Sequence, residues 1–125
     1  MNKKIIIGIT GGIAAYKIPQ LIRLFAKNGD EVTVVATKNA LQFVTELTLE
    51  TVSGNAVYSD VFAPRNEYNT EHIALADWAD MIVVAPATAN IIGKFASGIA
   101  DDALSTLLLA FAKDIVVCPA MNTNM

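Results

Sequence analysis

Cysteine and histidine are almost absent from this chain, which has one of each among its 125 residues. A single cysteine excludes an internal disulfide and makes a cytoplasmic setting the default expectation. With one histidine beside it, a structural zinc site would lack ligands, so we predict no metal site. His72 is the only side chain that could supply imidazole chemistry. A lone histidine is, however, more often structural or exposed than catalytic.

Long apolar runs and clustered positive charge are missing as well. No apolar run approaches the roughly 18 residues that a membrane-spanning helix needs. The first apolar run ends in glycines instead of a signal-peptide cleavage site. The nine lysines and arginines are scattered and the formal net charge is −3, so there is no basic stripe for nucleic acid. We therefore expect neither a nucleic acid nor a membrane as a partner.

Aromatic residues are also scarce, at 7% of a chain that is 54% hydrophobic. The excess is aliphatic and alanine-rich, which is typical of a parallel sheet covered by helices on both faces. It would also suit a surface that is buried between subunits.

Strand and helix patterns alternate along the chain, which predicts one α/β domain with a parallel sheet and right-handed crossovers. In the first helix, Pro19 is expected within the first turn or two and Gly29 at the C-terminal end. Residues 47–70 give no clear prediction beyond a weak strand signal near "AVYSDVF". The predicted strands are 4–9, 31–36, 81–85 and 114–118, the last one buried, and the predicted helices are 14–28, 39–46, 73–79 and 101–112.

In such sheets ligands bind beyond the carboxyl ends of the strands, here at residues 10–14, 37–40, 86–90 and 119–125. The glycines of the first loop would let a phosphate approach the backbone at a helix N-terminus. The dinucleotide fingerprint G-x-G-x-x-G fails, because Thr10 and Ile13 stand where it needs glycine. The Walker A spacing is absent too, since Gly93-Lys94 is followed by Phe95. A tight turn without a ligand remains an alternative for this loop.

Thr37 begins the second loop, where a dinucleotide-binding protein usually places an acidic residue for the ribose. A hydroxyl and backbone amides suit a phosphate better. The two loops together favour a phosphate-bearing ligand that is not a dinucleotide, such as flavin mononucleotide (FMN). The alternative, that Thr37 merely caps the next helix, is equally open.

The third and fourth loops carry neutral polar residues. Thr88 and Asn90 could read the edge of an isoalloxazine ring or a carboxylate, although either could simply be a helix N-cap, which is the commoner explanation. The fourth loop lies in "CPAMNTNM". Cys118 is expected to be a buried small hydrophobe and not a nucleophile.

The segments "GITGGIAAYK", "HIALADWADMIVVAPATANIIGKFASGIADD" and "CPAMNTNM" resemble the homo-oligomeric flavin-containing cysteine decarboxylases over nearly the whole chain. Within that family the resemblance is greatest to the phosphopantothenoylcysteine decarboxylases of bacterial coenzyme A biosynthesis. It implies a three-layer α/β/α Rossmann-like fold, FMN as cofactor, and assembly into homotrimers or dodecamers of trimers. Residues 1–125 would form an FMN-binding flavoprotein domain that is incomplete at its C-terminal end. A phosphopantothenate–cysteine ligase domain is a potential fusion partner.

The resemblance also implies a set of site residues. His72 would be catalytic, and Asn122 with Met121 would bind the substrate, Asn122 by gripping its carboxylate. The residues implied for FMN are Gly11, Gly12 and Ile13 at the phosphate with Thr37 nearby, Pro86, Ala87, Thr88, Ala89 and Asn90 along the flavin, and Ala120 through its backbone.

The implied reaction is the FMN-dependent decarboxylation of 4′-phosphopantothenoylcysteine to 4′-phosphopantetheine in coenzyme A biosynthesis. The alternatives are a flavoprotein of the same superfamily that acts on a peptidyl-cysteine or transfers a prenyl group to flavin, and a non-catalytic FMN-binding or interaction domain. The family's later cysteine, which completes the reductive half of the reaction, has no counterpart here, and Cys118 stands elsewhere. The chain alone is therefore expected to lack full turnover.

Overall fold

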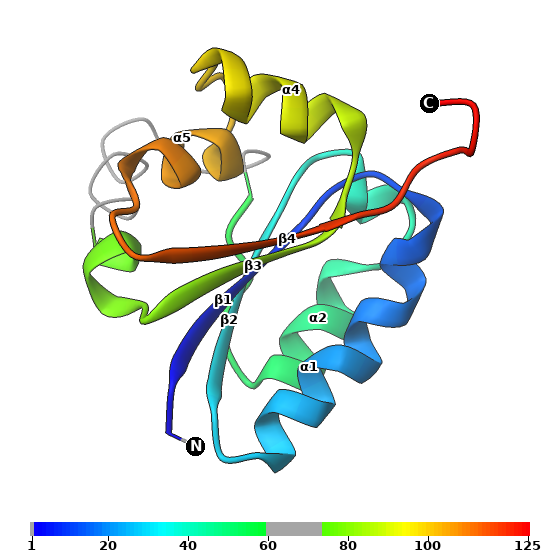
Figure 1. Ribbon diagram of the computed structural model, residues 1–125. Coiled ribbons are helices and arrows are strands. Elements are labelled where there is room, and N and C mark those ends of the chain that lie inside the picture. The colour runs from blue at the N-terminus through cyan, green and yellow to red at the C-terminus, as the bar shows by residue number, and fades with distance from the viewer. Residues whose placement is uncertain (1, 60–73) are drawn as a thin grey trace.

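A computed structural model describes residues 2–59 and 74–125 and contains a four-stranded parallel sheet (Figure 1). The strands are β1 (Lys4–Ile9), β2 (Glu31–Ala36), β3 (Met81–Ala87) and β4 (Asp114–Pro119). Their order across the sheet is β2-β1-β3-β4, and every pairing is parallel. The four predicted strands are confirmed, with β3 and β4 extending slightly further than the sequence indicated.

The strands form because their apolar residues supply both faces of the sheet. Successive side chains of a strand point to opposite faces. In β1, Ile5, Ile7 and Ile9 accordingly belong to one buried cluster, while Ile6 belongs to the other. Burial on both faces explains why these strands read as continuous apolar runs instead of alternating patterns.

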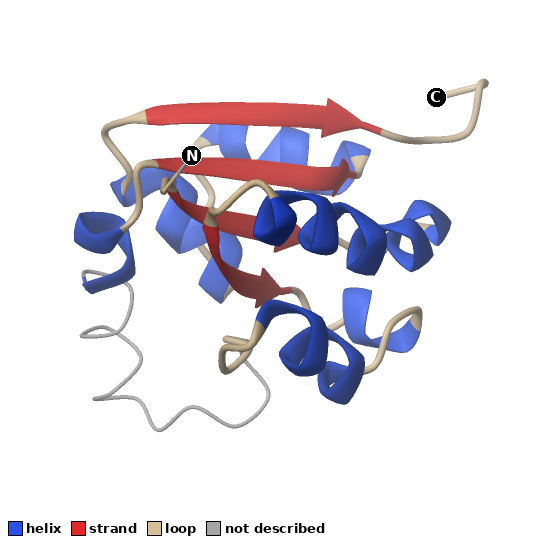
Figure 2. Cartoon of the chain, turned by 90° about the horizontal axis from the view of Figure 1, so that it is seen from below, coloured by secondary structure: helices blue, strands red, loops and turns tan. Residues whose placement is uncertain are grey.

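Helices cover both faces of the sheet, which confirms the three-layer α/β/α prediction (Figure 2). Helices α1 (Ile18–Lys27) and α2 (Glu46–Ser53) pack on one face. Helices α4 (Ala89–Ser97) and α5 (Ala103–Ala110) pack on the other, together with the helical residues 74–78. None of the helices in the described part of the chain is long and apolar enough to cross a membrane.

The first predicted helix is split in two. A 3₁₀ helix, η1 (Ile13–Lys17), leads directly into α1. Pro19 lies in the first turn of α1, where the missing N–H has no intrahelical acceptor to lose. Gly29 follows the helix with a φ of 88°, a left-handed conformation that glycine adopts without a steric cost.

The prediction between the second and third strands is partly wrong. Only a three-residue 3₁₀ helix, η2 (Ala40–Gln42), forms where a helix over 39–46 was expected. The regular helix is α2, which begins after Thr45, whose side chain accepts the N–H of Thr48 at 3.1 Å. The weak strand signal near Tyr58 corresponds to a single parallel bridge with Val35.

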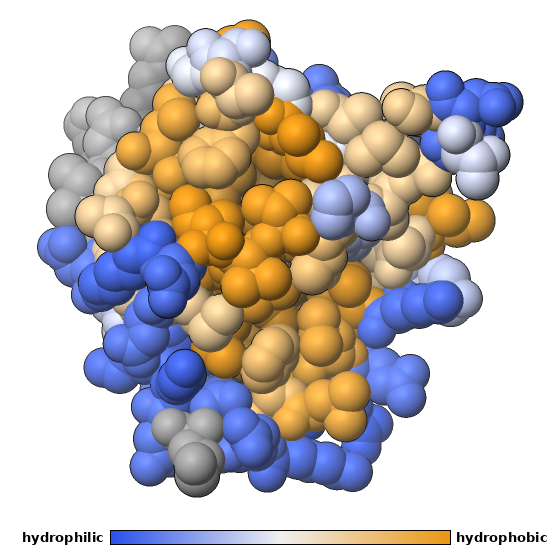
Figure 3. Space-filling view, viewed as in Figure 1, coloured by the Kyte–Doolittle hydropathy of each residue, from blue (hydrophilic) through white to orange (hydrophobic). Residues whose placement is uncertain are grey.

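The expectation that the last strand and Cys118 are buried is wrong. Strand β4 lies at the edge of the sheet, and among the described residues it pairs only with β3. Val116 and Val117 are about two-fifths exposed and Cys118 is exposed. The space-filling view shows an apolar surface that extends over β4 and the neighbouring helices (Figure 3). An edge position, which the apolar pattern of the strand does not reveal, is the reason for this exposure.

Candidate functional site

The candidate site lies where the direction of the chain across the sheet reverses. From β1 the chain passes to β2 on one side, and it later returns to β3 and β4 on the other. A parallel sheet has a crevice at such a point, beyond the carboxyl ends of the two central strands. The loops that flank it here follow β1 at Thr10 to Gly12 and β3 at Thr88 to Asn90.

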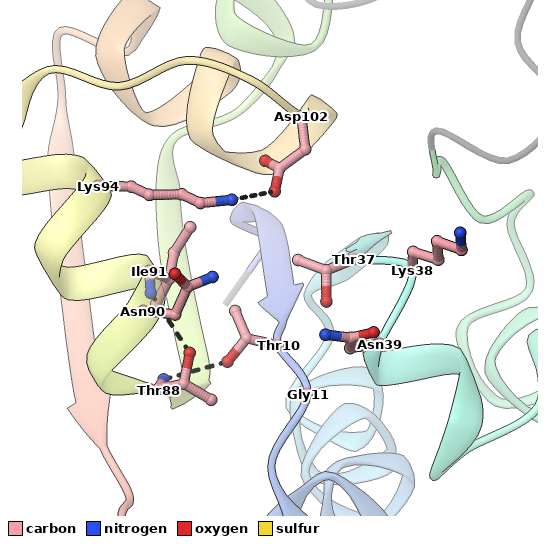
Figure 4. A pocket seen from close by; sticks show the side chains of 10 residues that line it. All are labelled: Thr10, Gly11, Thr37, Lys38, Asn39, Thr88, Asn90, Ile91, Lys94 and Asp102. Atoms are coloured by element: carbon pink, nitrogen blue, oxygen red, sulfur yellow. Dashed lines mark hydrogen bonds and ion pairs between the residues drawn. The ribbon is translucent and has the colours of Figure 1, made fainter.

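A first cavity of about 380 Å³ opens between the ends of β1, β2 and β3 (Figure 4). Most of the side chains around it are polar, and its volume lies in the range of small-molecule sites. The charged groups are two lysines and one aspartate, which leaves a formal excess of one positive charge. The lining residues are Thr10, Gly11, Thr37, Lys38, Asn39, Thr88, Asn90, Ile91, Lys94 and Asp102.

A second cavity of about 710 Å³ adjoins the first and shares Gly11, Thr88 and Asn90 with it. Its surface is mainly apolar. The site is therefore elongated, with a polar end and an apolar end that meet at the shared residues. The lining residues are Gly11, Gly12, Ile13, Ala14, Thr88, Ala89, Asn90, Ala120, Met121, Asn122 and Met125.

Gly11 lies at the contact between the loops that follow β1 and β2. A Cβ atom added to Gly11 would overlap the Cβ of Asn39 and lie 3.2 Å from the backbone carbon of the same residue. At Gly12 an added Cβ would only touch Pro86 and Thr88 at 3.6 Å, which is ordinary van der Waals contact. Of the two glycines, Gly11 is thus the one whose missing side chain allows the backbones to approach.

Thr10 joins the loops that follow β1 and β3. Its side chain is buried, with 2% of the residue exposed. Its hydroxyl donates to the carbonyl oxygen of Pro86 and accepts the N–H of Thr88 at 3.1 Å. The hydroxyl of Thr88 accepts the N–H of Ile91 at 3.3 Å and so caps α4. A connected set of hydrogen bonds therefore runs from the end of β1 to the first turn of α4.

Lys94 forms an ion-pair cluster at the rim of the polar cavity. Its Nζ lies 2.8 Å from Asp101. It also lies 3.2 Å from Asp102, which caps α5 (Figure 4). The hydrogen bond from Lys94 holds the pKa of Asp101 below its usual value, and the same bond is the main cause of a raised pKa at Lys94. The cluster joins α4 to the start of α5 across the cavity mouth.

Most of the residues predicted for the site line one of the two cavities. Thr37 lines the polar one, and its hydroxyl also accepts the N–H of Ala40, the first residue of η2, at 3.2 Å, although the N-cap residue of η2 is Asn39. Pro86 and Ala87 are buried within β3 and reach the loops through their carbonyl groups; Ala87 accepts the N–H of Ala120 at 3.1 Å. His72 lies outside the described residues. The nine that line the apolar cavity are Gly11, Gly12, Ile13, Thr88, Ala89, Asn90, Ala120, Met121 and Asn122.

Asn122 adopts a defined local conformation in the fourth loop. Its side-chain oxygen accepts the N–H of Asn124 at 2.8 Å, and its carbonyl accepts the N–H of Met125 at 2.9 Å. The side-chain NH2 group of Asn122 is its donor, and it is the group from which a ligand could accept a hydrogen bond.

Eight residues that line the two cavities were given no individual role by the sequence prediction, and Thr10, Asn39 and Lys94 are three of them that make contacts described above. Thr10 could have been found as a polar residue at the carboxyl end of a buried strand. Asn39 contributes through its position against Gly11, which leaves no sequence pattern. Lys94 pairs with aspartates seven and eight positions further along the chain, beyond the end of α4 at Ser97, so the i,i+3 and i,i+4 pairing rule for helices does not predict the contact.

Comparison with known proteins agrees with this geometry. The family model for flavoproteins matches residues 1–125. The chain is 51% identical over 99% of its length to the coenzyme A biosynthesis bifunctional protein CoaBC of Haemophilus influenzae, and it spans 31% of that protein. Among solved structures, a phosphopantothenoylcysteine (PPC) decarboxylase variant complexed with pantothenoylaminoethenethiol superposes with a TM-score of 0.84 at 32% identity, covering 98% of this chain and 69% of the other. The FMN-dependent cysteine decarboxylase TvaF of thioviridamide biosynthesis gives 0.92 at 27% identity, covering 100% and 77%.

Proposed function

Because this chain belongs to the flavoprotein family, we propose that it is an FMN-binding domain that decarboxylates 4′-phosphopantothenoylcysteine to form 4′-phosphopantetheine in coenzyme A biosynthesis. The observation that carries the proposal is the two-part cavity at the switch point of the sheet, polar at one end and apolar at the other. The 51% identity to a CoaBC protein favours this substrate over other cysteinyl compounds.

The residues of the cavity suit FMN in size and chemistry. The ring system would occupy the apolar end, between Ala89 and Ala120. The phosphate would lie at Gly11, which borders both cavities, near Thr37 and Lys38 of the polar end. Helix η1 begins beside it, and the first N–H groups of a helix have no intrahelical acceptor and point to where an anion can bind.

The protein's part in the reaction is to hold and orient the substrate. The chemistry that FMN would supply when bound is oxidation of the substrate's cysteinyl side chain, which allows its carboxylate to leave as carbon dioxide, followed by return of the hydride to give 4′-phosphopantetheine. Asn122 would hold that carboxylate through its amide N–H groups, because a carboxylate only accepts hydrogen bonds, and the bond from the N–H of Asn124 to the amide oxygen would orient the side chain. Met121 and Ala120 would form an apolar wall beside it that limits access of water. His72 stays a predicted acid–base or positioning group near the thiol.

Flavin binding is tested first, on the purified chain mixed with FMN. We expect the visible absorbance of oxidised flavin to remain with the protein after gel filtration, and the bound ligand to have the mass of FMN. A colourless chain that takes up no FMN would remove the main support of the proposal.

Substrate binding is tested with Asn122→Asp and the matched control Asn124→Asp. Aspartate at position 122 keeps the acceptor for the N–H of Asn124 but replaces the amide donor with a negative charge. We expect release of carbon dioxide from 4′-phosphopantothenoylcysteine in a single turnover to be lost while FMN stays bound. The control Asn124→Asp should release carbon dioxide as the wild type does. Wild-type release by Asn122→Asp would exclude Asn122 as the carboxylate ligand.

The catalytic role of His72 needs a variant of its own. His72→Asn should abolish carbon dioxide release without changing FMN uptake. Normal release in this variant would remove His72 from the mechanism.

A second candidate keeps the cofactor and changes the substrate. Its support is the likeness to TvaF, an FMN-dependent cysteine decarboxylase of thioviridamide biosynthesis, which makes another cysteinyl compound such as a peptidyl-cysteine the alternative substrate. Carbon dioxide release from a peptide that ends in cysteine, with none from 4′-phosphopantothenoylcysteine, would make this second candidate the preferred function. Activity with dimethylallyl phosphate alone would instead indicate a flavin prenyltransferase.

Assembly and fusion complete the proposal. The exposed apolar side chains of β4 support association into homotrimers or larger assemblies of trimers, and a monomer in sedimentation experiments would argue against it. The bifunctional relatives, of which the chain spans 31%, support a fused phosphopantothenate–cysteine ligase domain. A cytoplasmic location stays a prediction from the sequence alone.

A further inference from the structure

Thr10 is a buried polar residue at the centre of the site, and its hydroxyl is committed to the protein itself. A threonine hydroxyl has one proton to donate, and here that proton goes to the carbonyl oxygen of Pro86. The same oxygen accepts the N–H of Thr88. Thr10 therefore has no proton left for a bound phosphate, although it lines the polar cavity.

The two hydrogen bonds of Thr10 fix the position of the two walls of the site relative to each other. One wall is the loop of Gly11 and Gly12, and the other is the start of α4. Their contact is close, because an added Cβ on Gly12 would lie 3.6 Å from side-chain atoms of both Pro86 and Thr88. Figure 4 shows Thr10 between these walls, with its bond to Thr88 on the side of α4.

Loss of the hydroxyl would leave two backbone groups without their partner, the carbonyl of Pro86 and the N–H of Thr88. Buried polar groups without partners are strongly disfavoured. The loops would therefore separate to admit water or to rotate these groups outward. Thr88 also caps α4, so its displacement would move the first turn of that helix and Asn90 with it.

We propose that Thr10 is a positioning residue for the cofactor, whose hydroxyl holds the loops after β1 and β3 in the arrangement that accepts FMN. We call its two hydrogen bonds, to the carbonyl of Pro86 and from the N–H of Thr88, the clasp. This inference rests on the proposed function in one respect, the identity of the ligand. Thr10 acts through Pro86 and Thr88 and does not touch the flavin phosphate as a donor.

The experiment compares Thr10→Val, Thr10→Ser and Thr10→Cys with the control Thr45→Val. Valine has the shape of threonine without the hydroxyl, serine keeps the hydroxyl, and a thiol is a weak substitute for it. Thr45 caps α2 through a similar bond to Thr48, away from both cavities. Two quantities are measured on the free chain: the exchange rate of the Thr88 amide hydrogen, and the Kd for FMN from the quenching of flavin fluorescence.

For Thr10→Val we expect the Thr88 amide to exchange at least about tenfold faster, because it has lost its acceptor. The Kd for FMN should rise by about tenfold or more, since only a minor fraction of the molecules would keep the binding arrangement. Thr10→Ser should restore both quantities to near the wild-type values, and Thr10→Cys should lie between. Thr45→Val should lower overall stability without changing either one. If Thr10→Val does not fold, the comparison of Thr10→Ser with Thr10→Cys decides. The inference then requires the cysteine variant to show faster exchange of the Thr88 amide and a higher Kd for FMN than the serine variant.

Two results would overturn the inference. Unchanged exchange of the Thr88 amide in Thr10→Val would show that the clasp does not exist. Faster exchange with a wild-type Kd would show that the clasp exists but does not shape the flavin site. If the wild-type chain takes up no FMN, the proposed function fails and takes the cofactor role of Thr10 with it, while the exchange rates still report on the clasp.

Discussion

Replacing Gly11 with alanine would place a methyl group where the loops after β1 and β2 meet. The added Cβ would overlap the Cβ of Asn39 and approach its backbone carbon to 3.2 Å and its Cα to 3.4 Å. Backbone atoms cannot rotate away as the end of a long side chain can. Relief therefore requires a shift of the turn at residues 37–40, which is anchored by the bond between Thr37 and Ala40.

The expected loss of stability follows from this overlap. Forcing one extra methyl group into a packed contact typically costs about 1–3 kcal/mol. For a chain of this size that corresponds to a fall in Tm of roughly 4 °C for each kcal/mol. Gly12→Ala is the matched control, because its methyl group would meet nothing closer than 3.6 Å and its φ of −120° suits any residue. Its effect on stability should stay within about 0.5 kcal/mol.

The assay is urea unfolding of the two variants and the wild type, followed by titration with FMN. Gly11→Ala should unfold at a lower urea concentration with an unchanged slope, and it should bind FMN more weakly because the moved turn borders the polar cavity. A variant as stable as the wild type, with the same Kd, would refute the reasoning, since it would mean that the loops are not in contact at Gly11.

Three further predictions concern helices α4 and α5. Gly93 lies inside α4 with open space around it, so Gly93→Ala should stabilise the chain by about 0.5–1 kcal/mol in urea unfolding; a loss would contradict it. Asp102→Ala should cost about 0.5–2 kcal/mol because α5 loses its N-cap, and thermal unfolding should show a larger fall than for Asp101→Ala. The pKa of Asp101 is lowered by Lys94, so the pair stabilises the fold above about pH 4 and this contribution is lost as pH falls through the folded-state pKa. The raised pKa of Lys94 means that its own contribution is lost only at pH above its usual value of 10.5; Lys94→Met should flatten the acid side of a stability–pH curve, and an unchanged curve would speak against the pair.

The strands could be predicted because each is a local apolar run that ends at a loop residue. Helix α1 could be predicted as well, since Ile18 and Ile22 recur at helical spacing. Helix α2 gave a weaker signal, because only Leu49 of its residues is buried, and its caps at Thr45 and Gly54 had to be recognised in a stretch rich in turn residues.

The loops that form the site could be predicted from the sequence, but the contacts between them could not. Gly11 and Thr88 follow strands, and parallel strands bring their carboxyl ends together. The contact of Gly11 with Asn39 and the clasp of Thr10 with residues more than seventy positions away depend on how the strands are ordered in the sheet. The same ordering places β4 at the edge, which is why the burial of Cys118 was predicted wrongly.

Because β4 is exposed, the two sides of the site differ in how easily they open locally. Local opening costs least where a segment buries little apolar surface. Strand β1, which leads to Gly11, is almost wholly buried, whereas β4, which leads to Ala120 and Asn122, is mostly exposed. We therefore expect the loop at Gly11 to open less often than the loop at Ala120 and Asn122. Under the proposed function, a partner that covers β4 would make opening of the loop at Ala120 and Asn122 less frequent and would thereby tighten substrate binding without touching the substrate.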